Sequence, residues 1–281
     1  MADGGSVSRR SVWRKVLFEK QEYADNYVDA SFLQEMRKNV STETYGLNYL
    51  VWHSGVVSQQ ISSVAIFAVV FALLDMEYLH PTTLFLLTAI LSGFAALFLV
   101  SVDSTSSIGD LKTCVIFTVA LYGLSPVLKT LTESISTDTI YAMTTFMLLV
   151  HLLFHNYGAE GAMVSHAISL NSATFASVCL ASRLPTVWHV FVTILFAISL
   201  FALGPLTRLK LKMWRPSFDF VSTALLGVVS TVAVFSLSTS LTVLLAIAHV
   251  AVIFLCPLWL FRLQKLKNTI HGPWDEAVIT E

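Results

Sequence analysis

The chain has 281 residues, of which 55% are hydrophobic and 12% charged, and its mean hydropathy is +0.72. A typical soluble domain carries about 25% charged residues, so this composition excludes an ordinary soluble domain and predicts a membrane protein. The 17 basic and 18 acidic residues nearly balance, which leaves no basic surface for nucleic acid, and no nucleic-acid partner is expected.

Eight apolar segments of about bilayer length follow one another along the chain. A helix needs roughly 20 residues to cross the hydrocarbon layer, where it satisfies its own backbone hydrogen bonds. The sequence therefore predicts an all-α, polytopic membrane helical bundle of about eight transmembrane helices. The predicted spans are Val56–Leu74, Thr83–Val102, Leu111–Leu128, Thr139–Phe154, Ala162–Leu180, Val187–Leu206, Phe220–Leu237 and Leu241–Phe261.

The basic residues lie almost entirely on one side of the predicted spans. Lys and Arg that flank a span are retained in the cytosol. With eight spans, the side opposite the N-terminus receives only Lys129 and Arg183 of the 17 basic residues. Both termini are therefore predicted to be cytosolic, with a membrane domain at residues 50–261 between an N-terminal segment, 1–49, and a C-terminal tail, 262–281.

An interfacial helix is predicted in the N-terminal segment. Ser31 followed by Gln34 matches a capping box, which opens a helix. The residues of its apolar face would be Phe32, Leu33, Met36 and Val40. We expect this face to lie on the membrane or on a partner.

Small residues recur at every fourth position of the fifth predicted span. They are Ser165, Ser169, Ala173, Ser177 and Ala181. Such a ridge lets another helix approach closely, so it is predicted to be a packing face, and Ser169, Ala173 and Ser177 are candidate contacts for lipid or for another subunit. Asn171 lies off the ridge and is expected to need a hydrogen-bond partner inside the bundle.

Two groups of residues suggest catalysis, and neither is favoured. His151, His155 and His166 have a spacing from which a metal site can be drawn, but no carboxylate inside the spans would orient such ligands. Asp75 and Glu77 form an acidic pair of the kind that lipid-dependent glycosyltransferases use, but their loop is too short to build an acceptor pocket. No catalytic residue, metal or cofactor is predicted.

A turn rich in hydroxyl groups, Ser125 to Met143, joins the third and fourth spans. Lys129 and Glu133 lie one helical turn apart and are expected to pair at the interface. Together with Asp138 and Arg183 they are candidate contacts for lipid or for another subunit. The candidates for the N-cap of the next helix are Ser136, Thr137 and Asp138.

Four stretches resemble the phosphatidylinositol glycan class C family, and the similarity extends from Val12 to Ala277. They are Asp25–Asp29 with Phe32–Leu33 and Arg37–Asn39, then Ser125–Met143, Phe175–Pro185 and Ile270–Ala277. The resemblance implies a subunit of the endoplasmic-reticulum enzyme that transfers N-acetylglucosamine from UDP-N-acetylglucosamine to phosphatidylinositol. That reaction is the first step of GPI-anchor biosynthesis.

The resemblance also implies partners. These are phosphatidylinositol as the membrane lipid, a catalytic class A subunit, and further subunits of classes H, P, Q and Y. It implies no catalytic residue in this chain. Trp274, with the neighbouring Asp275 and Glu276, is expected to help dock the cytosolic tail on a partner.

The chain is therefore interpreted as a non-catalytic scaffold and a candidate lipid-presenting subunit. A nucleotide sugar is bound by a sizeable α/β domain, and no segment outside the spans is long enough to form one. Two alternatives stay open. The first is a membrane-embedded glycosyltransferase that uses Asp75. The second is a lipid or small-solute transporter, which is disfavoured because the predicted spans contain no Asp, Glu, Lys or Arg in their interiors.

Overall fold

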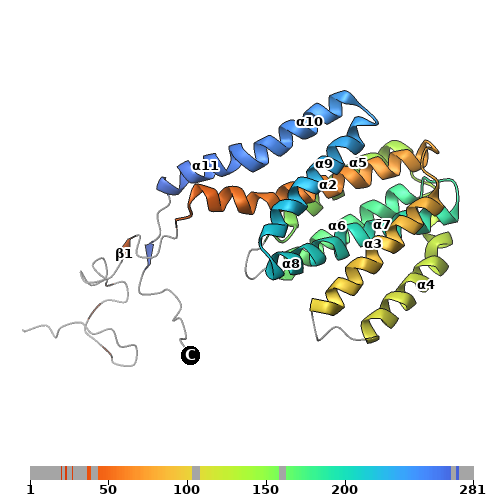
Figure 1. Cartoon of the computed structure of the whole chain (residues 1–281), viewed down its shortest axis with the longest axis horizontal. Coiled ribbons are helices and arrows are strands. Elements are labelled where there is room, and N and C mark those ends of the chain that lie inside the picture. The colour runs from red at the N-terminus through yellow and green to blue at the C-terminus, as the bar shows by residue number, and fades with distance from the viewer. Residues whose placement is uncertain are drawn as a thin grey trace, which may run out of the picture. The chain divides into compact units, whose positions relative to one another are not determined.

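The computed structural model describes residues 20, 23, 27, 37–38, 44–102, 108–157, 163–266 and 270–271. Within them, eight helical traverses follow one another along the chain (Figure 1). The first five are α2 (Leu47–Asp75), α3 (Pro81–Val102), α4 (Ile108–Thr130), α5 (Thr137–Phe154) and α6 (Met163–Ala181). The sixth traverse consists of α7 (Val187–Ile198), η1 (Ser199–Leu203) and α8 (Gly204–Trp214). The seventh is α9 (Ser217–Phe235). The eighth consists of α10 (Thr239–Val250), η2 (Ala251–Leu255), α11 (Cys256–Leu263) and η3 (Gln264–Leu266).

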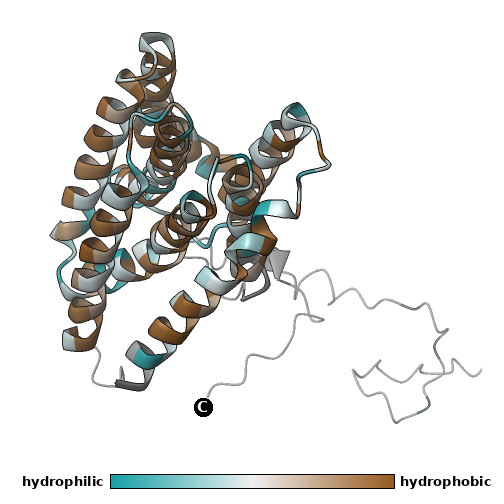
Figure 2. Ribbon diagram, turned by 90° about the vertical axis from the view of Figure 1, so that its right-hand side faces the viewer, coloured by the Kyte–Doolittle hydropathy of each residue, from teal (hydrophilic) through white to brown (hydrophobic). Residues whose placement is uncertain are grey.

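The predicted fold class is confirmed. Seven of these traverses are long and apolar enough to cross a membrane, and α6 is apolar from Ala167 to Ala181. Hydrophobic residues predominate along the helices (Figure 2), and many of the large ones are exposed. Because lipid is as apolar as these side chains, their exposure costs nothing in a bilayer, and the bundle depends on close packing and hydrogen bonds between helices.

Two traverses contain a π-helical turn, and each turn ends two residues before a proline. The turn η1 (Ser199–Leu203) lies before Pro205, and η2 (Ala251–Leu255) lies before Pro257. Proline lacks an N–H group and its ring crowds the carbonyl four residues earlier. The wider π turn accommodates that crowding, so α7 and α10 each continue past the proline.

The apolar core occupies one half of the bundle. It joins the second half of α2, around Phe67 and Leu74, to α6 and α7, with Ala173 and Val190 fully buried. The helices α3, α4 and α5 add side chains to this core. The other half of the bundle, toward the start of α2 and the turn between α8 and α9, is packed differently and holds buried polar groups.

The residues Gly46–Leu260 form one compact unit, and the described residues at the two chain ends belong to a second. In the second unit, strand β1 (Arg37–Lys38) pairs antiparallel with β2 (Ile270–His271). The backbone N–H of Tyr45 donates to Oε1 of Gln264 at 2.6 Å. The predicted interfacial helix therefore does not include Arg37 and Lys38, whose backbone pairs with a strand instead, and its other residues lie outside the described part of the chain.

One predicted loop is wrong. The basic segment from Arg208 to Arg215 was expected to be a loop, but Arg208, Lys210 and Lys212 lie in α8, and only Arg215 and Pro216 separate α8 from α9. The spans are correspondingly longer than hydropathy alone indicates, because long basic side chains at a helix end can extend their charged groups toward the membrane surface.

Candidate functional site

A buried polar layer lies in the half of the bundle where α2 and α9 begin, and its first part centres on Asp219. Gln59 Nε2 on α2 donates to Asp219 Oδ1 at 2.9 Å and to Thr223 Oγ1 at 2.8 Å. Lys212 Nζ on α8 pairs with Asp219 Oδ2 at 3.0 Å. The Asp219 side chain is 5% exposed and that of Lys212 is 26% exposed, so a largely buried carboxylate holds three helices together.

The second part of the layer runs through four helices. On α8, Arg208 donates to Gln60 Oε1 at 3.3 Å and to Ser63 Oγ at 3.2 Å. Gln60 in turn donates to Nε2 of His151 on α5, which leaves Nδ1 of that ring to donate to the Ser169 carbonyl on α6 at 2.9 Å. Gln60, His151 and Ser169 are each 1% exposed, so this chain of hydrogen bonds lies inside the bundle.

The third part joins the last traverse to α2. Ser58 Oγ and His249 Nδ1 lie 2.8 Å apart, and Ser54 Oγ donates to the Ile253 carbonyl at 3.5 Å. His249 therefore joins the last traverse to α2 through a side-chain hydrogen bond. The two contacts also fix the last traverse antiparallel to α2.

These contacts correct one sequence prediction. Charged residues do lie within the spans: Arg208 and Asp219 bond to residues of α2, and Lys212 pairs with Asp219. His151, near the end of α5, is buried between Gln60 and Ser169. The Gln59–Gln60 pair lies at the centre of the layer.

The small-residue ridge is buried within the chain. Ser169, Ala173, Ser177 and Ala181 are each at most 1% exposed, and α6 packs closely along α5. The side chain of Ser165 lies outside the described set. The predicted packing face therefore serves α6 within this chain, and Ser169, Ala173 and Ser177 present no surface to lipid or to another subunit.

The two long stretches that carry the family resemblance meet at the opposite end of the bundle. Lys129 Nζ donates to the Pro185 carbonyl, and Arg183 donates to the carbonyl of Thr132 and, at 3.1 Å, to its Oγ1. Thr132 also bonds with Ser182. These contacts form a lock that ties the end of α4 to the connection between α6 and α7. Its residues are Lys129, Thr132, Ser182, Arg183 and Pro185.

The other candidates around this lock are placed as follows. Glu133 and Asp138 are exposed, and Lys129 bonds with Pro185 instead of Glu133. Ser136 is the N-cap of α5, and its side chain accepts from the backbone N–H of Thr139. This confirms one of the three residues predicted as candidates for the N-cap. Trp274 lies outside the described residues.

The two groups that suggested catalysis are separated in the structure. His151 belongs to the polar layer, with the His155 ring 5.6 Å away, and the side chain of His166 lies outside the described set. Asp75 ends α2 and Glu77 follows it with φ of 60°, both exposed at the opposite end of the helix. Asp75 is 15 residues beyond Gln60, roughly 20 Å along the helix axis, so the acidic pair and the polar layer cannot act on one substrate group.

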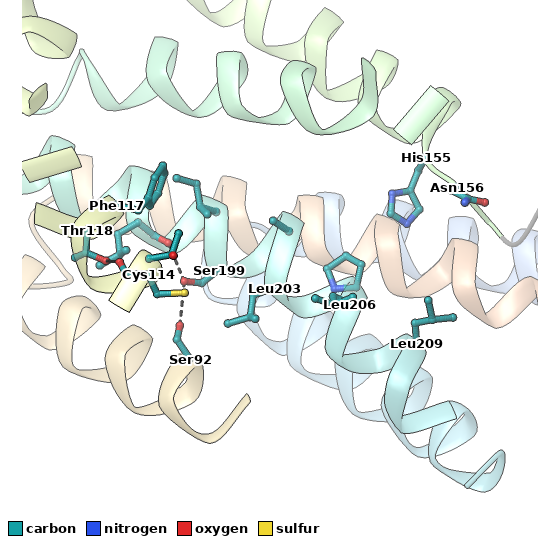
Figure 3. Close-up of a pocket in the computed structure, with 15 residues that line it drawn as sticks. Ser92, Cys114, Phe117, Thr118, His155, Asn156, Ser199, Leu203, Leu206 and Leu209 are labelled. Carbon is teal, nitrogen blue, oxygen red and sulfur yellow. Dashed lines mark hydrogen bonds between the residues drawn. The ribbon is translucent and has the colours of Figure 1, made fainter. Parts of the chain in front are cut away.

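A groove of about 710 Å³ lies beside the polar layer, between α3, α4 and the traverse that contains η1 (Figure 3). Its lining is mostly apolar and includes Phe117, Leu195, Leu203 and Leu206. The hydroxyl groups in its wall are already bonded, since Ser92 donates to Ser199 at 3.0 Å. An apolar concavity of this size is typical of a small-molecule or lipid site.

One end of the groove is polar and lies where helices end. His155 and Asn156, which follow α5, lie at this end, away from Phe117 (Figure 3). Tyr157 packs against His155 with 5.1 Å between ring centroids, and its hydroxyl donates to the Leu152 carbonyl at 2.6 Å. Burial raises the pKa of Tyr157 to about 12, so this hydroxyl stays a neutral donor that fixes the chain at the mouth of the groove.

The chain matches a known protein family over most of its length. Residues 13–275 match the sequence model of the GPI2 family, described as phosphatidylinositol N-acetylglucosaminyltransferase. The chain belongs to this family. It is 46% identical over 278 residues to the C subunit of human phosphatidylinositol N-acetylglucosaminyltransferase, covering 96% of this chain and 93% of that protein.

More distant members cover the chain equally well. The GPI2 subunit of the same transferase from Schizosaccharomyces pombe is 35% identical over 97% of this chain and 88% of its own length. The Saccharomyces cerevisiae GPI2 subunit is 25% identical over 95% of this chain and 97% of its own length. No solved structure matches the chain.

Proposed function

We propose that this chain is the non-catalytic, multi-pass subunit of a complex that transfers N-acetylglucosamine from UDP-N-acetylglucosamine to phosphatidylinositol, the first step of GPI-anchor biosynthesis. Membership of the GPI2 family supports the complex. The observation that carries the non-catalytic role is the buried polar layer, whose groups bond to one another across the helices. Polar groups that already bond to one another stabilise the fold and are not available to bind a substrate, so the substrate chemistry would belong to a partner.

The proposed partners are the catalytic class A subunit and the subunits of classes H, P, Q and Y. A nucleotide sugar needs a sizeable α/β domain, whereas the described spans of this chain form an all-helical membrane bundle. The donor would therefore be bound by a partner, and this chain would supply the membrane-embedded part of the enzyme.

The proposed location is the endoplasmic-reticulum membrane, with both termini cytosolic. The bias of Lys and Arg toward one side supports this orientation. The antiparallel contacts Ser54–Ile253 and Ser58–His249 also support it, because they bring the start of the first span and the end of the last to one end of the bundle. The polar layer and the mouth of the groove then face the cytosolic leaflet.

We further propose that the groove holds a phosphatidylinositol acyl chain and presents the headgroup at the cytosolic surface. From Leu195 to Leu209 the groove follows the traverse for 14 residues, roughly 20 Å, which is long enough to span one leaflet, half of a hydrocarbon core about 30 Å thick. Its mouth lies near basic α8, where Lys210 follows Leu206 by one turn, and near the exposed Lys112 at the start of α4. These cations suit a lipid phosphate.

Reconstitution tests the non-catalytic assignment. The purified chain in lipid vesicles should neither bind UDP-N-acetylglucosamine nor transfer from it, and the complete complex should do both. Transfer by the isolated chain that is lost in Asp75→Ala would instead establish a glycosyltransferase in its own right. Flux of lipid or solute through vesicles that contain only this chain would establish the transporter alternative.

A matched pair of variants tests the lipid groove. Ala202→Phe places a ring in the groove, and Ala248→Phe places the same ring in a separate apolar cavity of about 480 Å³ beside α2, α9 and α10. In the complete complex, Ala202→Phe should raise KM for phosphatidylinositol and reduce labelling of this chain by a photoactivatable phosphatidylinositol. Ala248→Phe should change neither. Equal labelling of both variants and the wild type would refute the acyl-chain site.

A further inference from the structure

Asn171 lies in the middle of α6 and is exposed on the outside of the bundle. No hydrogen bond joins its side-chain amide to another residue that the structure describes. The sequence predicts a hydrogen-bond partner for Asn171 inside the bundle. This prediction is wrong, because the buried ridge of α6 lies on a different face of the helix from Asn171. In the described part of the chain, Asn171 is the one exposed amide or charged side chain near the middle of a span.

The surface around Asn171 is formed by α5 and α6 together. The contact between His151 and Ser169 sets these helices antiparallel, so the outward residues of α5 lie beside those of α6. The residues of this surface, which we call the Asn171 face, are Phe146, Leu149, Leu153, Ile168, Asn171 and Phe175, all exposed. Thr145 at its edge donates to the Tyr141 carbonyl of its own helix at 2.8 Å. A hydroxyl can be satisfied by such a bond within its own helix, but the two donors and the acceptor of an amide cannot.

We propose that the Asn171 face binds a transmembrane helix of another subunit, and that this helix carries a hydrogen-bonding side chain at the depth of Asn171. The inference rests on the proposed function, in which the chain belongs to a membrane complex. Lipid tails offer no donor or acceptor, so an exposed amide at this depth is costly in a bilayer. A polar side chain on a neighbouring helix satisfies it, and such contacts are a recognised means of association between membrane helices.

Asn171→Leu tests the proposal, with Asn48→Leu as the matched control. Asn48 is also exposed but lies in the first turn of α2, where water can satisfy its amide. When the tagged chain is purified from membranes, recovery of the interacting subunit should fall between about threefold and about twentyfold for Asn171→Leu, the range expected for one interhelical hydrogen bond. Asn48→Leu should recover normal amounts, and the melting temperature of isolated Asn171→Leu should not fall.

A photo-crosslinking residue at position 171 provides a second measurement that does not depend on stability. An adduct whose mapped peptide lies in a membrane span of a co-purifying subunit supports the proposal. An adduct with a second copy of this chain, distinguished by a different tag, or with lipid alone overturns it, as does full subunit recovery by Asn171→Leu. If the wild-type chain recovers no other subunit, the proposed function itself fails, which separates the two outcomes.

Discussion

Removing either member of the Asp219–Lys212 pair should destabilise the chain, and the two losses should be unequal. In Asp219→Ala, Gln59 keeps its bond to Thr223 at 2.8 Å, and Lys212, 26% exposed, can turn to water. The loss is then mainly one charge-assisted hydrogen bond and a partly screened ion pair, about 2 to 3 kcal/mol. In Lys212→Met, the Asp219 carboxylate, 5% exposed, stays buried without its ion-pair partner, which costs about 3 to 5 kcal/mol.

Thermal unfolding of the purified chain in one detergent measures both losses. Asp138→Ala is the matched control, because Asp138 also lies in the first turn of a helix but is exposed. It should lose no more than about 1 kcal/mol, the contribution of an acid to a helix dipole. A melting temperature of Asp219→Ala equal to that of Asp138→Ala would refute the stabilising role of the polar layer. A larger loss for Asp219→Ala than for Lys212→Met would refute the reasoning from exposure.

Three further predictions follow from the packing and the charge pattern. Ala173→Leu should overpack the buried ridge and cost about 1 to 3 kcal/mol in a detergent melt, whereas Ala167→Leu, exposed on the same helix, should cost almost nothing. Arg183→Ala should lower stability by about 1 to 3 kcal/mol by leaving buried acceptors in the lock unpaired, and Glu133→Ala should not. Asn39 should acquire no glycan in microsomes, whereas a sequon engineered into an extended loop beside Arg183 should be glycosylated. The reverse pattern would refute the predicted eight-span orientation.

The spans could be predicted from the sequence because a bilayer imposes a length and a polarity on every helix that crosses it. Their ends were less predictable. The first helix begins at Leu47, nine residues before the predicted Val56, because Asn48, His53 and Ser54 interrupt the apolar pattern without interrupting the helix. Likewise α8 contains charged residues that hydropathy assigns to a loop.

The polar layer could not be predicted, because its contacts join residues far apart in the sequence. Gln59 and Asp219 are 160 positions apart, and Ser58 and His249 are 191 apart. Each residue alone is ambiguous, since a glutamine in a span indicates either exposure or a buried partner. The ridge of α6 was predictable because its period is local and depends only on helix geometry.

In the proposed orientation, the lock would connect the Ser125–Met143 and Phe175–Pro185 stretches to a reaction on the opposite face of the membrane. The groove is bounded by α4 on one side and by the traverse from α7 to α8 on the other. Lys129 joins the end of α4 to Pro185, just before α7, and Arg183 joins the same connection to Thr132. Because α4 and α7 both run from the lock to the groove, a contact that fixes their spacing at the lock would also set the width that the groove offers to the proposed acyl chain.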